Sequence, residues 1–319
     1  MSRSSESSSR GVVSGGLAQT MRNHPILSFF VLAYAVSSIL WIPVLLFGLP
    51  TFNPATHAPS LAILPGIAIG VTGSAFFMTW LTQGRAGVRR LLQRLVWWRV
   101  GLQWYAVAVL LIPVTEVLIA ATVFGTPDVL GALSPSALLL YPAAYAAHVF
   151  FGPLFEEAGW RGFALPRLQH RYGPLRGTLL LGVLWAGWHF FLYLPDFFQA
   201  GNIVDGLVST ANFVVFAASV SIIFTWLLNN TQASLLLAIL LHGSIDGTST
   251  YLQVLADRGV ISPEATSNSF GLGATIACLI WALLLITLTR GRLSYPRYQR
   301  EAEPLDLRPS MEQQPAPRA

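Results

Sequence analysis

The stretch that decides the fold of this chain is residues 155–161, Phe-Glu-Glu-Ala-Gly-Trp-Arg. It places two adjacent carboxylates and an arginine directly after a long apolar run. Ionised side chains inside or just beneath a membrane are costly unless they are paired or hydrated, so they usually mark a functional site. On a helix, Glu157 and Arg161 lie four residues apart on one face, whereas Glu156 points about 100° away. We therefore expect a structural pair of Glu157 and Arg161 near the membrane interface, with Glu156 left for chemistry.

The composition is that of a membrane protein. Of 319 residues, 54% are hydrophobic and 10% are charged, against about 25% charged residues in a typical soluble domain. We predict an all-α, polytopic integral membrane protein. All 19 basic residues are arginines that lie between apolar stretches, so we interpret them as topology signals and expect no nucleic-acid partner. The single cysteine, Cys278, excludes an intrachain disulfide and a cysteine-based zinc site.

Apolar stretches of about 20 residues, the length that a membrane-spanning helix needs, predict eight spans. They lie near residues 26–49, 61–82, 103–124, 136–155, 177–194, 207–228, 233–252 and 270–289. We expect a membrane domain of residues 25–290 between two disordered tails, 1–24 and 291–319, because the composition of the tails cannot bury a core.

The arginines predict the orientation of these spans. Eight spans place both termini on the same side of the membrane, together with 18 of the 19 arginines, and leave only Arg258 on the other side. By the positive-inside rule, both termini are cytoplasmic. The absence of lysine is typical of a bacterium with a GC-rich genome, so we expect the protein in a bacterial inner membrane.

Two further polar pairs lie inside the expected spans. Trp185 and His189 are four residues apart on the fifth span, and His242 and Asp246 have the same spacing on the seventh. By helical rise, His189 lies near the middle of the membrane and His242 somewhat closer to the cytoplasm. Glu156 ends the fourth span. We expect these side chains to meet in one cavity in the cytoplasmic half of the bundle.

Taken in order, the three motifs resemble the pattern of the CPBP family, the CAAX-prenyl-protease and bacteriocin-processing intramembrane proteases. The family pattern is Glu-Glu-x-x-x-Arg, Phe-x-x-x-His and His-x-x-x-Asn/Asp on successive helices, and here it lies at residues 156–161, 185–189 and 242–246. The resemblance covers about residues 135–252, and eight spans suit the family's eight-helix fold. Trp185 stands where the family usually has phenylalanine.

The resemblance implies a glutamate-dependent endopeptidase that hydrolyses peptide bonds within the membrane. In family terms, Glu156 and His189 would hold and activate water, while His242 and Asp246 would polarise the scissile carbonyl or stabilise the oxyanion. Glu157, Arg161 and Trp185 would support them. The expected partners are the lipid bilayer and a membrane-embedded protein or peptide substrate, because bacteria generally lack prenylated CAAX proteins. The sequence indicates neither the cleavage site nor the oligomeric state.

Two predictions have an alternative: the absence of a metal and the activity as a protease. Glu156, His189 and His242 could bind zinc as a His₂Glu hydrolase site does, and the family was long described as metalloproteases. We favour a metal-free site, because no His-Glu-x-x-His motif is present and the mechanism inferred for relatives needs no metal. A non-catalytic immunity or scaffold protein, or a proton-coupled transporter, is the rival function. The three ordered motifs and the lack of an internal repeat favour the protease.

Two other polar residues lie within the expected spans. His148 precedes Glu156 by eight residues, only loosely on the same helix face, and we expect it to be a histidine satisfied by helix packing. Glu116, on the third span, has no motif around it. It is open whether Glu116 is a protonated packing acid, the partner of a buried polar group, or part of the cavity.

Overall fold

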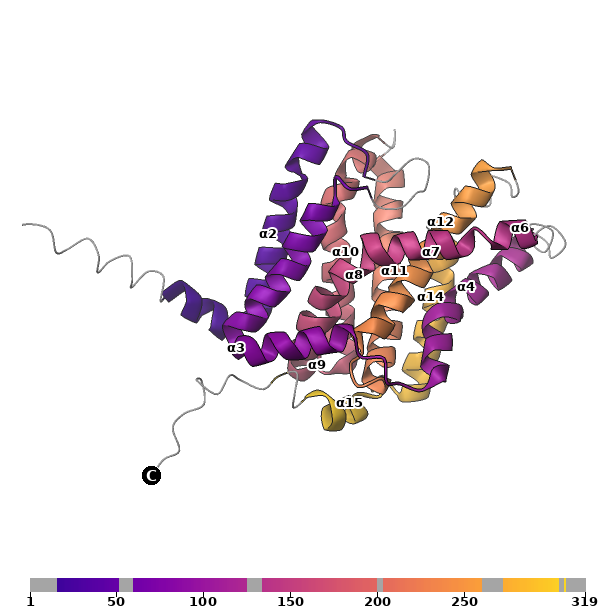
Figure 1. Ribbon diagram of the computed structural model, residues 1–319. Helices are drawn as coiled ribbons and strands as arrows, with labels where there is room; N and C mark the ends of the chain where they lie inside the picture. Colours follow the sequence, from indigo (N-terminus) through magenta and orange to yellow (C-terminus); the bar gives the residue numbers. More distant parts are fainter. Residues whose placement is uncertain are drawn as a thin grey trace, which may run out of the picture.

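The computed structural model describes residues 16–51, 60–124, 134–199, 203–259, 272–303 and 307. Over these ranges every regular element is a helix, and the longest helices pack side by side as a bundle (Figure 1). The predicted all-α fold is confirmed.

Six helices are long and apolar enough to cross a membrane. They correspond to six of the eight expected spans and follow one another as α2 (Pro25–Leu46), α4 (Leu102–Phe124), α10 (Pro174–Gln199), α11 (Ile203–Asn230), α12 (Leu235–Asp257) and α14 (Leu272–Thr289). Of these, α12 is the most enclosed, because α4, α7, α8 and α11 all pack against it.

The span expected near residues 61–82 is helical but contains a π-helical turn. Residues Gly66–Gly73 form this turn, η1, and α3 (Ser74–Leu95) continues from it. Gly84 breaks α3 with a φ of 63°, a left-handed conformation that costs glycine little. Beyond Gly84, the arginine-rich half of α3 runs across one end of the bundle (Figure 1).

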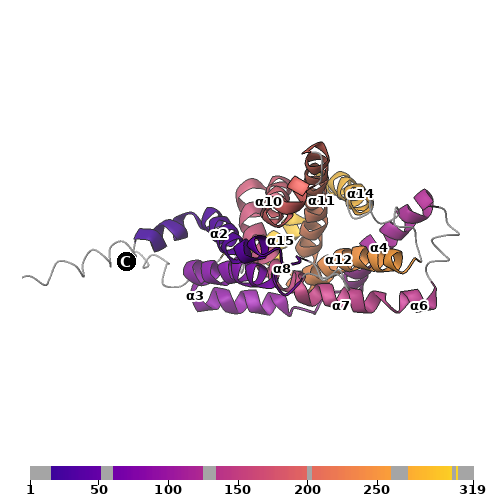
Figure 2. The same cartoon turned by 90° about the horizontal axis from the view of Figure 1, so that it is seen from above.

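The span expected near residues 136–155 is not one helix. It is divided into α6 (Pro135–Leu138), α7 (Tyr141–Phe151) and α8 (Pro153–Glu157). Each helix carries a proline in its first turn, where proline is tolerated, whereas a proline further inside would break the helix. The axis of α7 is steeply inclined to the axes of α10 and α11 (Figures 1 and 2), and α7 packs against α12 and α8. The number of membrane crossings therefore stays a prediction.

Helix α7 is held against α12 by two glycines of α12. A Cβ on Gly243 would lie 2.4 Å from Cγ2 of Val149, and one on Gly247 would lie 2.8 Å from Cα of Tyr145. The helices therefore approach so closely that only glycine fits, as at many helix contacts in membranes. This contact brings α8, and the two glutamates it carries, beside His242.

The C-terminal region is ordered further than the sequence predicted. The tail expected from residue 291 begins with α15 (Tyr295–Glu301), whose Tyr298 is only 1% exposed. Tyr295 and Tyr298 pack against Ala233 at the start of α12, and this aromatic contact explains why the segment folds. Residues 16–23 are also helical; residues 1–15 and 308–319 lie outside the described ranges. The start of α2 and α15 lie at the same end of the bundle (Figure 1), as the predicted topology requires.

Candidate active site

The two adjacent glutamates are both buried where α8 joins a second π-helical turn, η2 (Ala158–Ala164). Glu156 is 5% exposed and Glu157 is fully buried. After η2, α9 (Leu165–Tyr172) leads back toward α10. Single π-helical turns are rare and often occur at functional sites, so this junction is the natural centre of a candidate site.

Glu157 joins two helices that are distant in the sequence. Its Oε1 accepts hydrogen bonds from Nη1 of Arg161 at 3.0 Å and from Nδ1 of His242 at 2.7 Å. The predicted pair of Glu157 and Arg161 is confirmed. The pair lies in the interior of the protein, where Glu157 and Arg161 are both fully buried, and its depth in the membrane stays a prediction. Glu157, more than Asp246, orients the ring of His242.

Aromatic rings surround the charge of Arg161. Its guanidinium carbon lies 4.4 Å from the ring centroid of Trp185 and 3.8 Å from that of Phe224. Nε and Nη2 of Arg161 have no hydrogen-bond partner among the described residues. Cation–π attraction, which strengthens when the cation is desolvated, and the ion pair with Glu157 therefore offset the cost of burying this charge.

Glu156 is held by two tryptophans. Its Oε2 accepts one hydrogen bond from the indole of Trp160 at 3.2 Å and another from the indole of Trp185 at 3.0 Å. The family that the sequence resembles usually has phenylalanine at position 185, whereas the indole of Trp185 supplies a donor that phenylalanine lacks. Trp160 was missed as a site residue, although its spacing of four from Glu156 could have indicated the contact.

His189 lies close to Glu156 and is oriented by its own helix. Its Nδ1 is 2.9 Å from the carbonyl oxygen of Trp185. A carbonyl only accepts, so Nδ1 carries the proton and the lone pair of the neutral ring is at Nε2. The expected contact with Trp185 is present, edge to face, at 5.4 Å between the ring centroids. Glu156 is within electrostatic range of both His189 and His242.

Asp246 lies between two histidines. Its Oδ2 is 3.5 Å from Nε2 of His242 and 3.8 Å from Nδ1 of His148. The expected proximity of His242 and Asp246 is confirmed. His148 does make a packing contact, with the hydroxyl of Thr250, but its other nitrogen faces the candidate site. The spacing within α7 could not indicate this, because the contact forms between α7 and α12.

Glu116 belongs to the edge of the same cluster. Its side chain is buried on α4, and Oε1 has no hydrogen-bond partner among the described residues. It interacts electrostatically with Asp246. Of the three interpretations left open, this position favours an acid that borders the site.

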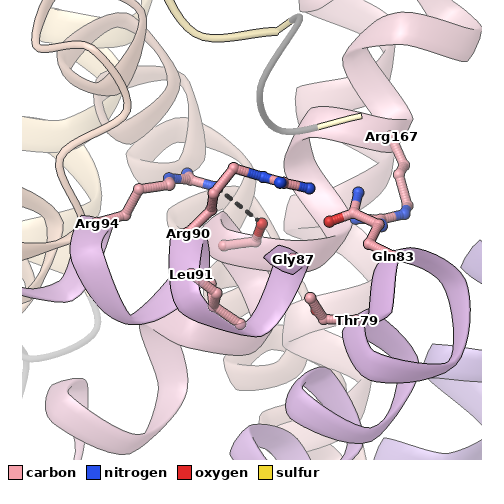
Figure 3. A pocket seen from close by; sticks show the side chains of 8 residues that line it. Thr79, Gln83, Gly87, Arg90, Leu91, Arg94 and Arg167 are labelled. Atoms are coloured by element: carbon pink, nitrogen blue, oxygen red, sulfur yellow. Dashed lines mark hydrogen bonds between the residues drawn. The ribbon is translucent and has the colours of Figure 1, made fainter. Parts of the chain in front are cut away.

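Arg94 fixes the π-helical turn from outside. It donates to the carbonyl oxygens of Arg161 at 3.2 Å, Gly162 at 3.1 Å and Ala233 at 2.9 Å, and so ties η2 to the start of α12. Figure 3 shows Arg94 and Arg90 beside a small polar cavity that Gly162 also lines. Its volume of about 10 Å³ is about that of one water molecule.

Glu156, His189 and His242, the ligands of the alternative zinc site, do not fit a zinc ion in this arrangement. Among the described residues, no group of three histidine, cysteine, aspartate or glutamate side chains could hold a metal ion. Glu156 accepts from two indoles through Oε2, and His242 donates through Nδ1 to Glu157. The metal-free site stays a prediction.

Fold and site together define a class of protein. Helices suited to span a membrane enclose a cluster of ionisable side chains, and in such a bundle these side chains are rare and usually functional. The chain is a multi-pass membrane protein with a buried polar site, formed by Glu156, Glu157, Arg161, His189 and His242.

Comparison with known proteins shows which family the central segment resembles. Residues 136–248 match the family model described as type II CAAX prenyl endopeptidase, Rce1-like. A protein named CAAX prenyl protease 2, from Methanococcus maripaludis, is 32% identical over 108 residues, which are 34% of this chain and 40% of that protein. The central segment is therefore similar to this family, and the match covers less than half of this chain and of the relative. The segment contains Glu156, Glu157, Arg161, His189 and His242, whereas Glu116 lies outside it.

Proposed function

We propose that this protein is an intramembrane endopeptidase that hydrolyses peptide bonds of membrane-associated proteins or peptides, in the cell membrane of a bacterium. The family of the central segment supports the activity. The observation that carries the proposal is that the two adjacent glutamates have different partners. Glu157 binds Arg161 and His242, whereas Glu156 is held by two indoles beside His189.

In this proposal Glu156 is the general base. The two indoles hold Oε2, and the other carboxylate oxygen, Oε1, accepts a proton from the attacking water. Nε2 of His189, which carries the lone pair of the neutral ring, accepts a second hydrogen bond from the same water. A base and a water held within hydrogen-bond distance are the geometric requirement for this step. Attack on the scissile carbonyl then places negative charge on its oxygen.

His242 stabilises that oxyanion. Its Nδ1–H donates to Glu157, which fixes the plane of the ring. Its Nε2–H, on the side of Asp246, donates to the oxyanion in this proposal. A fixed donor aimed at the developing charge, in a site that excludes water, contributes about 3–4 kcal/mol in well-studied enzymes. Asp246 keeps Nε2 protonated, and the proton taken up by Glu156 passes to the leaving amine.

The experiment compares Glu156→Gln with Glu157→Gln in liposomes, using a fluorogenic membrane peptide. Glu156→Gln keeps the shape but removes the proton acceptor, so turnover should fall at least about 10³-fold with little change in unfolding temperature. Glu157→Gln leaves Arg161 buried without its counterion and should lower the unfolding temperature markedly, with only part of the activity lost. An active Glu156→Gln beside an inactive, well-folded Glu157→Gln would reverse the two roles. A folded wild type that cleaves no membrane peptide would favour the non-catalytic alternative.

A further inference from the structure

We propose that a second site, away from the buried cluster, binds the phosphate group of an anionic phospholipid. The site is a cavity of about 220 Å³ between three segments that are distant in the sequence. These are residues 99–104 at the start of α4, residues 230–232 between α11 and α12, and α15. Its polar lining comprises Arg99, Gln103, Asn230, Thr231, Gln232 and Arg297.

The chemistry of the cavity favours an anion. None of the described residues that line it is acidic, and two of them are arginines. Guanidinium groups match the oxygens of phosphate, and such charge-assisted hydrogen bonds are roughly twice as strong as neutral ones. Gln103 and the indole of Trp104 add further donors.

The two arginines are held in place by different contacts. Arg297 lies on α15, which is docked through the buried ring of Tyr298. Nε of Arg297 is 3.0 and 3.1 Å from the two carboxylate oxygens of Glu301, and this contact uses one of the five donors of the guanidinium. The guanidinium carbon of Arg99 lies 5.6 Å from the ring centroid of Trp98.

The surroundings favour a lipid over free phosphate as the source of the anion. Apolar side chains beside the cavity are strongly exposed, with Trp98 at 63% and Leu102 at 82%. Exposed tryptophan beside arginine is typical of the membrane interface. A headgroup in the cavity would place its acyl chains along Leu102 and the exposed face of α4, where Leu110 is 53% exposed. The bound lipid would then link α15 to the start of α4.

The test measures lipid retention by native mass spectrometry of the full-length protein. The protein in detergent is titrated with phosphatidylglycerol, with phosphatidylcholine of the same chains, and with inorganic phosphate. Wild type should retain phosphatidylglycerol preferentially, and Arg99→Gln with Arg297→Gln should weaken that retention about tenfold or more, because two charge-assisted contacts are lost. Arg300→Gln, an exposed arginine of α15 that does not line the cavity, is the matched control and should bind as wild type.

Each other outcome overturns the proposal. Equal retention of the two lipids would show that charge is not recognised, and unchanged retention by the double variant would place the lipid elsewhere. Displacement of the lipid by millimolar inorganic phosphate would indicate a free-phosphate site. Arg99 is exposed, so Arg99→Gln alone keeps the fold, and it should show a smaller loss in the same direction if the double variant unfolds.

Discussion

Trp185 gives Glu156 a hydrogen bond that phenylalanine, usual at this position in the family it resembles, cannot give. Trp185→Phe keeps a ring against Arg161 but removes this donor. We expect kcat to fall about tenfold, because one hydrogen bond to a charged group is worth about 1.5–3 kcal/mol. Peptide cleavage in liposomes measures the effect. The control is Trp281→Phe, which removes an indole hydrogen bond from α14 to Thr115 on α4 and should remain active. Equal losses of activity in both variants would show that Trp185 has no specific role.

The hydrogen bonds of single residues also predict whether the activity needs a metal. Because Oε2 of Glu156 and Nδ1 of His242 are engaged with protein partners, we expect cleavage to persist after exhaustive chelation. Elemental analysis of the purified protein should find zinc well below one ion per chain. Activity that chelation abolishes and zinc restores would contradict the metal-free mechanism, while the residues of the site would remain the same.

Sequence alone located the pairs that form within one helix. Glu157 with Arg161 and His242 with Asp246 follow from the local period of the α-helix. The bond from His242 to Glu157 spans 85 positions, and no local pattern indicates it. The contact of His148 with Asp246 was not predicted for the same reason, since it forms only after α7 packs on α12. The contacts of this site that the sequence could not predict are those between helices that are distant in the sequence.

At the scale of helices, Gly247 decides how α7 sits on α12. A Cβ at this position would lie 2.8 Å from Cα of Tyr145, so Gly247→Ala must displace the backbone of α7. We expect a loss of about 1–3 kcal/mol in unfolding free energy, typical of overpacking, and reduced activity because α8 moves with α7. Thermal unfolding and peptide cleavage measure both effects.

Gly73→Ala is the matched control for Gly247→Ala. Gly73 is also helical, but a Cβ there would lie 3.7 Å from its nearest neighbour, a side-chain carbon of Ile69, which is an ordinary contact. Gly73→Ala should leave stability unchanged or slightly raised. If Gly247→Ala is equally harmless, α7 and α12 do not need their close approach.

Apolar length predicted the helices better than it predicted their interruptions. Six expected spans are present as long apolar helices. A backbone in lipid must satisfy its own hydrogen bonds, and a helix does so within one segment. The same criterion merged α6, α7 and α8 into one span. Proline in the first turn of each short helix and Gly152 before α8 were the available signals, but whether such residues kink or end a helix depends on the packing around them.

For the whole molecule, the arginine distribution predicts the topology. Reporter fusions test it directly. We expect a cytoplasmic signal after residues 24, 95, 172 and 300, and an external signal after residues 55, 130, 202 and 262, because 18 of the 19 arginines then face the cytoplasm. The external positions lie outside the described ranges. A cytoplasmic signal after residue 202 would contradict the predicted crossing of α10.

The rings over Arg161 also bear on how the protein is made. Trp185 and Phe224 belong to α10 and α11, so the ribosome synthesises them after Arg161 has already emerged. A nascent chain that ends at α9 has the buried arginine but lacks both rings and His242, and an unshielded cation is costly in lipid. We therefore expect the segment from α8 to η2 to stay at the lipid–water surface, with Arg161 paired only with Glu157, until α10, α11 and α12 have inserted. On this expectation the buried cluster forms only after the later helices α10, α11 and α12 have inserted, although α8 and η2 precede them in the chain.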